Sequence, residues 1–207
     1  FITFEGPEGC GKSTHAGLLF DFLKGLGYPC IRTREPGGTK AGELIRQVLL
    51  HARDCDLSDL TELFLFEAAR AQIVSEVIIP ALSKGTIVIC DRFSDATLAY
   101  QGYGGKLPLP LVRQMNRAAT GGLTPDLTIL LDVDVATGLR RAKAKGVDRM
   151  EEKKAAYHSS VRRGYLALAK AEPERIKKMR LKPVVAHTQK NIQKLVTGFL
   201  ADRTYVI

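Results

Sequence analysis

The chain has 207 residues, of which 45% are hydrophobic and 26% charged, and its formal net charge is +9 at pH 7. This composition is ordinary for a globular protein and excludes a disordered chain, while no apolar run approaches the roughly 18 residues that span a membrane. The length favours one α/β domain over residues 1–207.

Basic residues are concentrated in the segment 140–194, which holds 17 Lys+Arg against 5 Asp+Glu and therefore carries +12. The rest of the chain holds 14 against 17 and carries −3. A basic segment suits nucleic acid, an anionic membrane or a small polyanion such as a nucleotide, and a solvated helix surface is equally consistent with it. Charge alone does not choose among these.

The four cysteines, at positions 10, 30, 55 and 90, have neither CxxC spacing nor the paired spacing of a metal site. The four histidines are equally scattered along the chain. We therefore expect free thiols in a reducing cytoplasm and no zinc site.

Strand-like and helix-like segments alternate along the chain. Four apolar segments have the length of buried strands and lie at 1–5, 29–34, 86–90 and 127–133. Helical patterns lie between and after them at 16–26, 44–50, 61–82, 111–119 and 134–168, the last with a break at 146–147. This alternation predicts a parallel sheet covered on both faces, with ligands at the carboxyl ends of the strands.

Two of these regions carry further expectations. The segment 61–82 is apolar almost all round, which predicts burial on several sides. Residues 177–183 are mostly basic and end in Pro183, so the sequence leaves the last strand of such a sheet open.

The segment GPEGCGKS at 6–13 matches the phosphate-loop pattern G-x-x-x-x-G-K-[ST], between a strand and a helix. Glycines let backbone N–H groups converge on phosphate oxygens, and the helix N-terminus adds positive potential. The pattern predicts an ATP or GTP site in which Lys12 reaches the β- and γ-phosphates and Ser13 binds Mg²⁺. The expected nucleotide-binding residues are Gly6, Glu8, Gly9, Cys10, Gly11, Lys12, Ser13 and Thr14.

An acid follows the strand-like segment 86–90. Asp91 stands where a phosphate-loop protein places its second metal residue, so we expect the metal at Ser13 and Asp91. Arg92 comes next, and an arginine at this edge of the sheet can hold phosphate with two hydrogen bonds.

Three classes of phosphate-loop protein compete for this sequence. A GTPase switch should carry an Asn-Lys-x-Asp guanine reader, which the sequence lacks. A nucleic-acid-binding ATPase would use the +12 segment as its track, although 207 residues leave little room for further modules. A small-molecule kinase needs an acceptor-phosphate site and a mobile cover from this same chain.

Six segments, taken in order from residue 1 to about 175, resemble bacterial thymidylate kinase (dTMP kinase): GPEGCGKST (6–14), TREPGGT (33–39), FEAAR (66–70), DRFSDATLAYQGY (91–103), PDLT (125–128) and DRME (148–151). The resemblance implies an α/β, three-layer P-loop kinase fold, with a central parallel sheet of about five strands and a small helical lid near 140–153. It implies transfer of the ATP γ-phosphate to dTMP, giving dTDP and ADP for dTTP biosynthesis. Mg²⁺ is the implied metal, and the implied assembly is a homodimer through the long apolar helices, with neither nucleic acid nor membrane as partner.

The resemblance also assigns the thymine site. Phe66 matches the residue that stacks on thymine, Arg70 and Gln101 match residues that bond its edge, and Thr97 matches a small hydroxyl facing the base. Phe66 and Arg70 are four residues apart and share a helix face. On so apolar a helix an arginine lacks an obvious partner, so we expect Arg70 to need a ligand.

The sugar and phosphates of the acceptor have their own matches. Tyr100 and Tyr103 match aromatics near the sugar, and Glu8 and Glu35 match acids near the sugar and the metal. The residues expected to grip the acceptor phosphate are Arg34 and Arg92.

The catalytic arginine is expected in the lid, because Gly9 stands where one subgroup of the family places an arginine. Arg149 is the leading candidate, with Arg140 and Arg141 as helpers. The expected catalytic set is Lys12, Asp91, Arg92 and Arg149. The alternatives are a kinase for another nucleotide or nucleoside and the nucleic-acid-binding ATPase.

Overall fold

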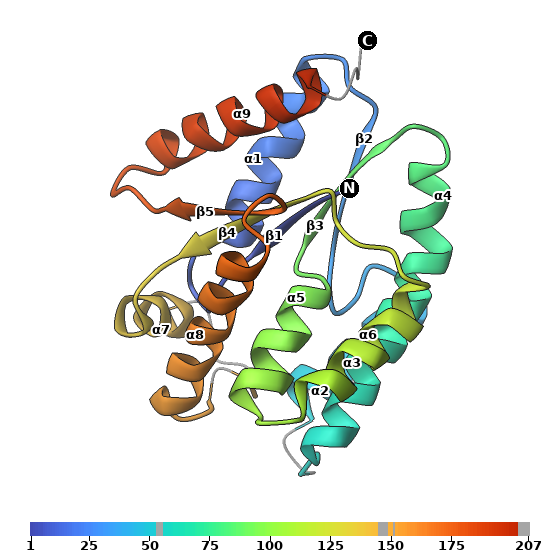
Figure 1. Ribbon diagram of the computed structural model, residues 1–207, viewed down its shortest axis with the longest axis vertical. Helices are drawn as coiled ribbons and strands as arrows, with labels where there is room; N and C mark the ends of the chain where they lie inside the picture. Colours follow the sequence, from blue (N-terminus) through green and yellow to red (C-terminus); the bar gives the residue numbers. More distant parts are fainter. Residues whose placement is uncertain (53–55, 145–148, 151, 203–207) are drawn as a thin grey trace.

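The computed structural model describes residues 1–52, 56–144, 149–150 and 152–202. A parallel sheet of five strands lies at its centre, in the order β2-β3-β1-β4-β5 (Figure 1). The strands are β1 (Ile2–Glu5), β2 (Cys30–Arg34), β3 (Ile87–Asp91), β4 (Leu127–Asp132) and β5 (Ile176–Arg180). The four strands predicted from apolar runs are confirmed, as is the α/β class.

The fifth strand, which the sequence left open, lies in the basic segment near the C-terminus and completes the sheet of about five strands that the resemblance implies. β5 lies at the edge of the sheet and pairs with β4 alone, so it needs an apolar side chain only where it packs. Ile176 is buried in one cluster and Met179 packs against another, while Lys178 is exposed. Pro183 lies beyond the strand and interrupts no ladder hydrogen bond.

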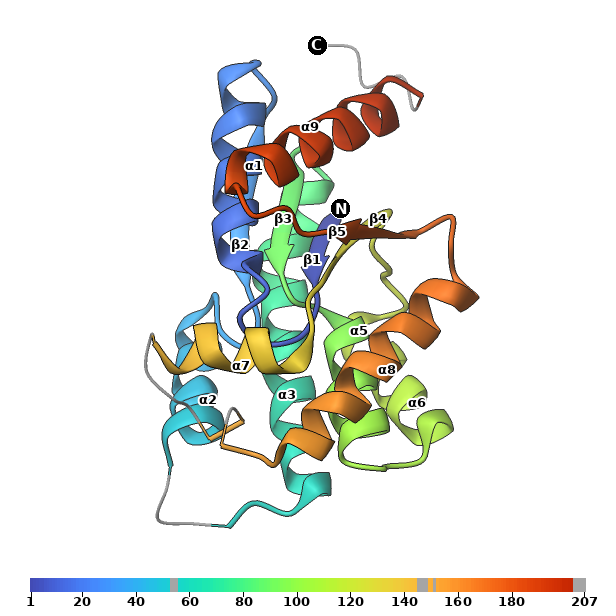
Figure 2. The same ribbon diagram turned by 90° about the vertical axis from the view of Figure 1, so that its left-hand side faces the viewer.

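The helices form a layer on each face of the sheet, as Figures 1 and 2 show together. Side chains alternate along β4: Leu127, Ile129 and Leu131 pack with helices α1 and α9, and Leu130 packs on the opposite side with α8. The α-helices are α1 (Lys12–Gly25), α2 (Lys40–His51), α3 (Asp59–Ile73), α4 (Ile79–Leu82), α5 (Ser94–Thr97), α6 (Leu109–Thr120), α7 (Val135–Lys143), α8 (Ala155–Ala171) and α9 (Val185–Ala201). Among these described helices, none is long and apolar enough to cross a membrane.

Two helical segments depart from the α-helical hydrogen-bond pattern. The predicted helix at 61–82 is α3 and α4 joined by a π-helical segment, η1 (Val74–Ile78). Phe64 and Ile79 of this region are about half exposed, so the expected burial on several sides is wrong at these positions. The glycine-rich stretch after α5 is a second π-helix, η2 (Leu98–Gly104). It contains Tyr100, Gln101 and Tyr103, three of the residues predicted for the acceptor site.

The sequence patterns do not predict α9. The predicted break at 146–147 lies outside the described residues, as do Asp148 and Glu151 of the DRME segment. The helices on either side of that break, α7 and α8, confirm the helical prediction there.

Glu5, at the end of β1, links the sheet to the segment that follows β3 and to helix α8. Its side chain is fully buried, and one carboxylate oxygen accepts hydrogen bonds from the backbone N–H groups of Phe93 (2.7 Å) and Ala96 (3.2 Å). The other oxygen accepts from the hydroxyl of Tyr165 in α8 at 2.7 Å. Burial raises the pKa of Glu5 to about 7, with the charge of Asp95 adding to the effect and that of Arg92 opposing it.

This raised pKa predicts a pH-dependent stability. Between pH 4.5 and about 7 the folded protein keeps a proton that the unfolded chain has lost, so the free energy of unfolding should fall as the pH rises through this window. A Glu5→Gln variant cannot titrate, and its fall should be smaller than the parent's, by up to about 3 kcal/mol. Urea unfolding at pH 5, 6, 7 and 8 measures the difference. Parallel profiles for the parent and the variant would contradict the assignment.

Candidate active site

A cavity of about 280 Å³ opens at the carboxyl ends of the strands, between the phosphate loop, the end of β2, α3 and η2. Most of the residues predicted for the site line it. These are Glu8, Gly9, Gly11, Lys12, Ser13, Thr14, Arg34, Glu35, Phe66, Arg70, Asp91, Arg92, Thr97, Tyr100 and Gln101.

Six predicted residues do not line this cavity, among them Arg140 and Arg141, which are exposed on α7. Gly6 lies against the backbone of Leu131, and Cys10 is buried beneath the side chain of Lys12. Tyr103 packs its ring against Gly164 of α8. Arg149 is held beside α3, as described below.

The phosphate loop has the predicted strand–loop–helix context. α1 begins at Lys12, and its first turn has neither an acidic residue nor a side-chain cap, so its N–H groups are open to an anion. The Lys12 ammonium donates to the carbonyl oxygens of Gly6 and Pro7, each at 3.0 Å, and approaches the Cys10 sulfur. Lys12 is thus 7% exposed and folded over its own loop.

Ser13 and Asp91 meet as predicted for a metal site. They come from α1 and the end of β3, and the Ser13 hydroxyl donates a short hydrogen bond to the Asp91 carboxylate. A hydroxyl and a carboxylate are hard oxygen donors of the kind that Mg²⁺ prefers, so the pair fits this metal.

Arg92 is the central cation of the cavity. Its backbone has a φ of +73°, which turns the chain sharply after β3. The guanidinium donates to Glu8 at 2.8 Å, to the hydroxyls of Tyr100 (2.9 Å) and Tyr165 (3.1 Å), and to the Gly6 carbonyl oxygen at 3.2 Å. Burial alone would raise the pKa of Glu8, but the charges of Arg92 and Lys12 outweigh it and lower that pKa to about 2. Glu8 and Arg92 therefore both stay charged inside the cavity.

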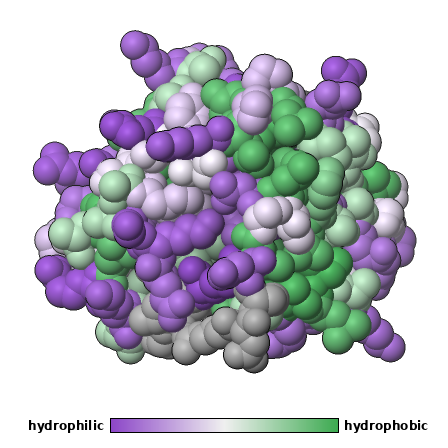
Figure 3. Space-filling view, turned by 90° about the horizontal axis from the view of Figure 1, so that it is seen from below, coloured by the Kyte–Doolittle hydropathy of each residue, from purple (hydrophilic) through white to green (hydrophobic). Residues whose placement is uncertain are grey.

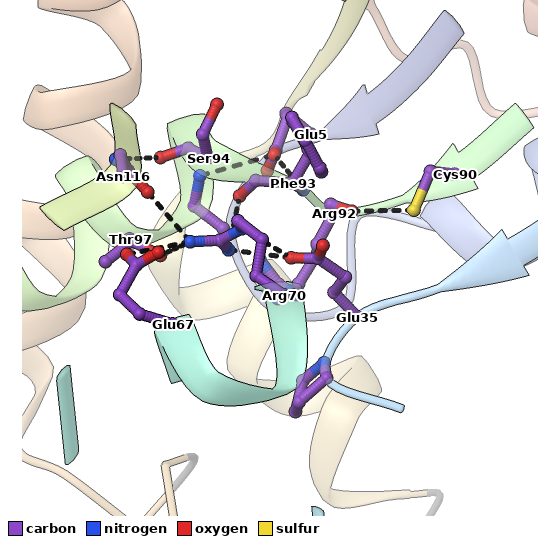
Figure 4. A network of polar contacts seen from close by, with 12 residues as sticks. Glu5, Glu35, Glu67, Arg70, Cys90, Arg92, Phe93, Ser94, Thr97 and Asn116 are labelled. Carbon is purple, nitrogen blue, oxygen red and sulfur yellow. Dashed lines mark hydrogen bonds and ion pairs between the residues drawn. The ribbon is translucent and has the colours of Figure 1, made fainter. Parts of the chain in front are cut away.

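Arg70 lies beside the cavity in a network of protein partners (Figure 4). It is 1% exposed, and its Nε and one terminal nitrogen bind a carboxylate oxygen of Glu35 at 2.9 and 2.7 Å. The remaining acceptors are a carboxylate oxygen of Glu67 (2.9 Å), the Thr97 hydroxyl (2.7 Å), the Asn116 side-chain oxygen (2.8 Å) and the Phe93 carbonyl oxygen (3.1 Å). The expectation that Arg70 needs a ligand is wrong, because its own chain satisfies all five N–H donors.

Glu35 has a free acceptor beside this network. One of its oxygens binds Arg70, while Oε1 is buried without a hydrogen-bond partner among the described residues. Burial raises the pKa of Glu35 to about 7, although Arg70 opposes the shift. A buried carboxyl oxygen that lacks a donor suits a hydroxyl-bearing ligand in the cavity.

Arg34 and Arg149 are paired with residues outside the phosphate loop. Arg34 donates to both carboxylate oxygens of Glu43 in α2, each at 3.0 Å. Arg149 donates to the carbonyl oxygen of Leu49 (2.9 Å) and to a carboxylate oxygen of Glu62 in α3 (2.7 Å). Both arginines would have to change partners to reach a phosphate.

Several residues of the site are not among those predicted from the sequence. The lining residues it did not name are Pro36, Arg46, Leu50, Ala96, Ala142 and Met150. Glu62 was missed as well, although a signal was present: Glu62, Phe66 and Arg70 follow each other at four-residue spacing and therefore share one face of α3.

The cavity combines a phosphate loop with Asp91 at the end of a strand and with Arg92. It also extends to residues of α3 and η2, away from the loop. These features on a parallel sheet define a phosphate-loop kinase of the α/β class. Comparison with known proteins narrows the class. The family model for thymidylate kinase matches residues 4–192, so the chain belongs to the thymidylate kinase family. Members of this family phosphorylate thymidylate, and the chain is accordingly a dTMP kinase by family.

Individual relatives agree with the family match. A thymidylate kinase of Synechococcus sp. (strain JA-2-3B'a(2-13)) is 53% identical over 176 residues, which cover 85% of this chain and 84% of the relative. A thymidylate kinase of Roseiflexus sp. (strain RS-1) is 43% identical over 217 residues, which cover 99% of this chain and 96% of the relative. The crystal structure of thymidylate kinase from Ehrlichia chaffeensis has a TM-score of 0.79 and 33% identity, covering 95% of this chain and 97% of that one. This likeness confirms the phosphate-loop kinase fold.

Gly9 predicts a steric limit on the phosphate loop. Its φ is +65°, and a Cβ there would lie 2.0 Å from the carbonyl oxygen of Gly138 in α7. Gly85 has a similar φ of +70°, with nothing within 4 Å of an added Cβ. Gly9→Ala should therefore lower the free energy of unfolding by about 2 kcal/mol more than Gly85→Ala, as measured by urea unfolding. Equal losses would show that α7 yields to the added group.

Proposed function

We propose that this chain transfers the γ-phosphate of ATP to dTMP in the cavity described above, giving dTDP and ADP for dTTP biosynthesis. One observation carries the proposal: a single cavity is lined both by Lys12 and Ser13 of the phosphate loop and by Phe66 and Gln101 of α3 and η2. A kinase must hold donor and acceptor phosphates in line, and one continuous cavity allows this.

At the acceptor end, the half-buried ring of Phe66 is the stacking surface for thymine. Gln101 is the reader of the base edge, and Thr97 lines the same end. Arg70 contributes by holding the Thr97 hydroxyl and Glu35 in place, and it reaches the base only by sharing a donor that already has a partner.

The sugar and the acceptor phosphate lie between the two ends. The free Oε1 of Glu35 is the acceptor for a sugar hydroxyl, and Tyr100 forms the wall beside it. Tyr103 packs on Gly164 of α8 without lining the cavity. Arg92 holds the acceptor phosphate, with Arg34 joining when it releases Glu43.

At the donor end, the loop residues 6–14 cradle the phosphates of ATP. Lys12 exchanges the Gly6 and Pro7 carbonyl oxygens for phosphate oxygens, which carry full negative charge. Ser13 and Asp91 are the residues that would hold Mg²⁺, which would supply charge neutralisation between the phosphates. Phosphoryl transfer needs little covalent help from the protein, so these charges and this positioning supply most of the rate.

Residues 140–153 act as the lid of a single domain that covers residues 1–207. Arg149 is the catalytic arginine, and it must leave Glu62 and the Leu49 carbonyl oxygen to reach the phosphates. Arg140 and Arg141 are exposed on α7, whose Gly138 touches the phosphate loop, and they are the helpers in this role.

The assembly is a homodimer formed through α2 and α3. These helices pack together and expose Leu44 (72%) and Val48 (40%) from α2 and Leu60 (41%) and Phe64 (49%) from α3. Hydrophobic residues also gather on one side of the molecule seen from below (Figure 3).

The described cysteines Cys10, Cys30 and Cys90 are free thiols, which supports a reducing, cytoplasmic location.

A panel of acceptors tests the function. ADP release is measured with Mg-ATP and each of dTMP, dUMP, UMP, CMP, AMP and GMP, and dTMP should give the highest kcat/KM. Preference for another nucleotide would keep the phosphate loop and overturn the base site. If no acceptor raises ADP release but DNA or RNA does, in a salt-sensitive manner, the nucleic-acid-binding ATPase replaces the kinase.

Lys12→Ala tests the phosphate end separately. Removing the ammonium that neutralises phosphate charge should lower kcat by about 100-fold or more. Lys84→Ala, on the surface beyond α4, is the matched control and should keep the parent's turnover. Near-normal turnover in Lys12→Ala would overturn the assignment of this cavity as the active site.

A further inference from the structure

The orientation of one amide group decides which pyrimidine fits the base end of the cavity. Gln101 is 2% exposed and lines the cavity from η2. A carboxamide presents an oxygen that accepts or an NH₂ group that donates. Thymine carries a hydrogen on N3, whereas N3 of cytosine is an acceptor. An amide oxygen at this point therefore favours thymine, and an NH₂ group favours cytosine.

Glu62 of α3 fixes this orientation. Nε2 of Gln101 donates to Oε1 of Glu62 at 2.9 Å, and Glu62 is itself 2% exposed. An ionised carboxylate only accepts, so the NH₂ group must face Glu62. The amide oxygen of Gln101 has no donor among the described residues, and it is the atom left for a base.

Two cations hold Glu62 from its other side. Arg149 donates to Oε2 of Glu62 at 2.7 Å, while Lys153 lies 3.2 Å from Oε1 and 3.3 Å from Oε2. The carboxylate cannot rotate without breaking one of these contacts. Oε1 thus stays with Gln101, and Lys153 still holds the carboxylate when Arg149 leaves Oε2 for the phosphates.

From these contacts we infer that Glu62 is a positioning residue for pyrimidine selection: it turns the Gln101 amide so that its oxygen accepts the N3–H of thymine. The inference rests on the proposed function, in which Gln101 reads the base edge. Glu62 lies behind Gln101 and acts through it.

Glu62→Gln should invert the amide. Arg149, and Lys153 once Arg149 has left for the phosphates, bind more strongly to the remaining oxygen than to an NH₂ group, so the new NH₂ group faces Gln101. Gln101 then turns its own oxygen toward residue 62 and its NH₂ group toward the cavity. The variant should lose activity on dTMP and gain it on a cytosine nucleotide.

The readout is the ratio of kcat/KM for dTMP to that for 5-methyl-dCMP at saturating Mg-ATP. These acceptors share the sugar, the phosphate and the 5-methyl group and differ in the base edge. Glu62→Gln should lower the ratio at least about tenfold, with a higher KM for dTMP and a KM for ATP within about twofold of the parent's.

Two further variants separate positioning from a general loss of structure. Lys153→Ala removes one cation but leaves the contact between Glu62 and Gln101, so its ratio should stay within about twofold of the parent's. In a Gln101→Ala background, Glu62→Gln should change the ratio no further, because the amide is gone. The same fall in that background would overturn the inference, since Glu62 would then act by another route.

Glu62→Asp guards against a Glu62→Gln variant that does not fold. It keeps the negative charge for the flexible side chains of Arg149 and Lys153 but withdraws the oxygen from Gln101 by one methylene. Its ratio should fall at least about threefold. An unchanged ratio in the folded variants overturns the inference alone, whereas a parent that does not phosphorylate dTMP overturns the proposed function as well.

Discussion

The buried guanidinium of Arg70 is the interaction on which the site depends. It binds Glu35 after β2, Glu67 on its own helix, the backbone at Phe93 after β3, and Asn116 of α6. A buried charge is costly unless it is paired, and burial would by itself lower the pKa of Arg70, but Glu35 and Glu67 raise it above its ordinary value. Because the partners come from different elements, the charge fixes how α3 and α6 sit against the carboxyl edge of the sheet.

The remaining charges at this edge follow the same rule. Lys12 binds loop carbonyl oxygens, Ser13 binds Asp91, Arg34 binds Glu43 and Arg149 binds Glu62. Each of these side chains thus has a partner within the protein. Substrate binding on the proposed mechanism is an exchange of partners, which avoids leaving a charge desolvated and alone. Arg92 differs from these groups because its partners Glu8 and Tyr100 line the same cavity as Arg92 itself.

Local patterns account for many of the predicted residues that line the cavity. The phosphate loop is one continuous segment, and its glycines and lysine act through the local backbone, so eight letters suffice to find it. Asp91 and Arg92 follow a buried strand whose end must lie at the ligand edge of a parallel sheet. The resemblance to the family supplied the proposed base site at Phe66, Thr97 and Gln101, which spacing alone leaves open.

The sequence by itself determined the α/β class, four strands, the phosphate loop and the family. Tertiary structure decided the rest, because pairing between distant residues leaves no local signature. The basic strand β5 lies at an edge of the sheet and pairs with β4 alone, so two apolar side chains, Ile176 and Met179, suffice to pack it. The partners of Arg70 and Glu62 are likewise far apart in the chain, up to 46 residues for Asn116 and 91 residues for Lys153. Burial and charge pairing at those distances are properties of the folded protein, and they turn an apparently unpartnered arginine into a structural centre.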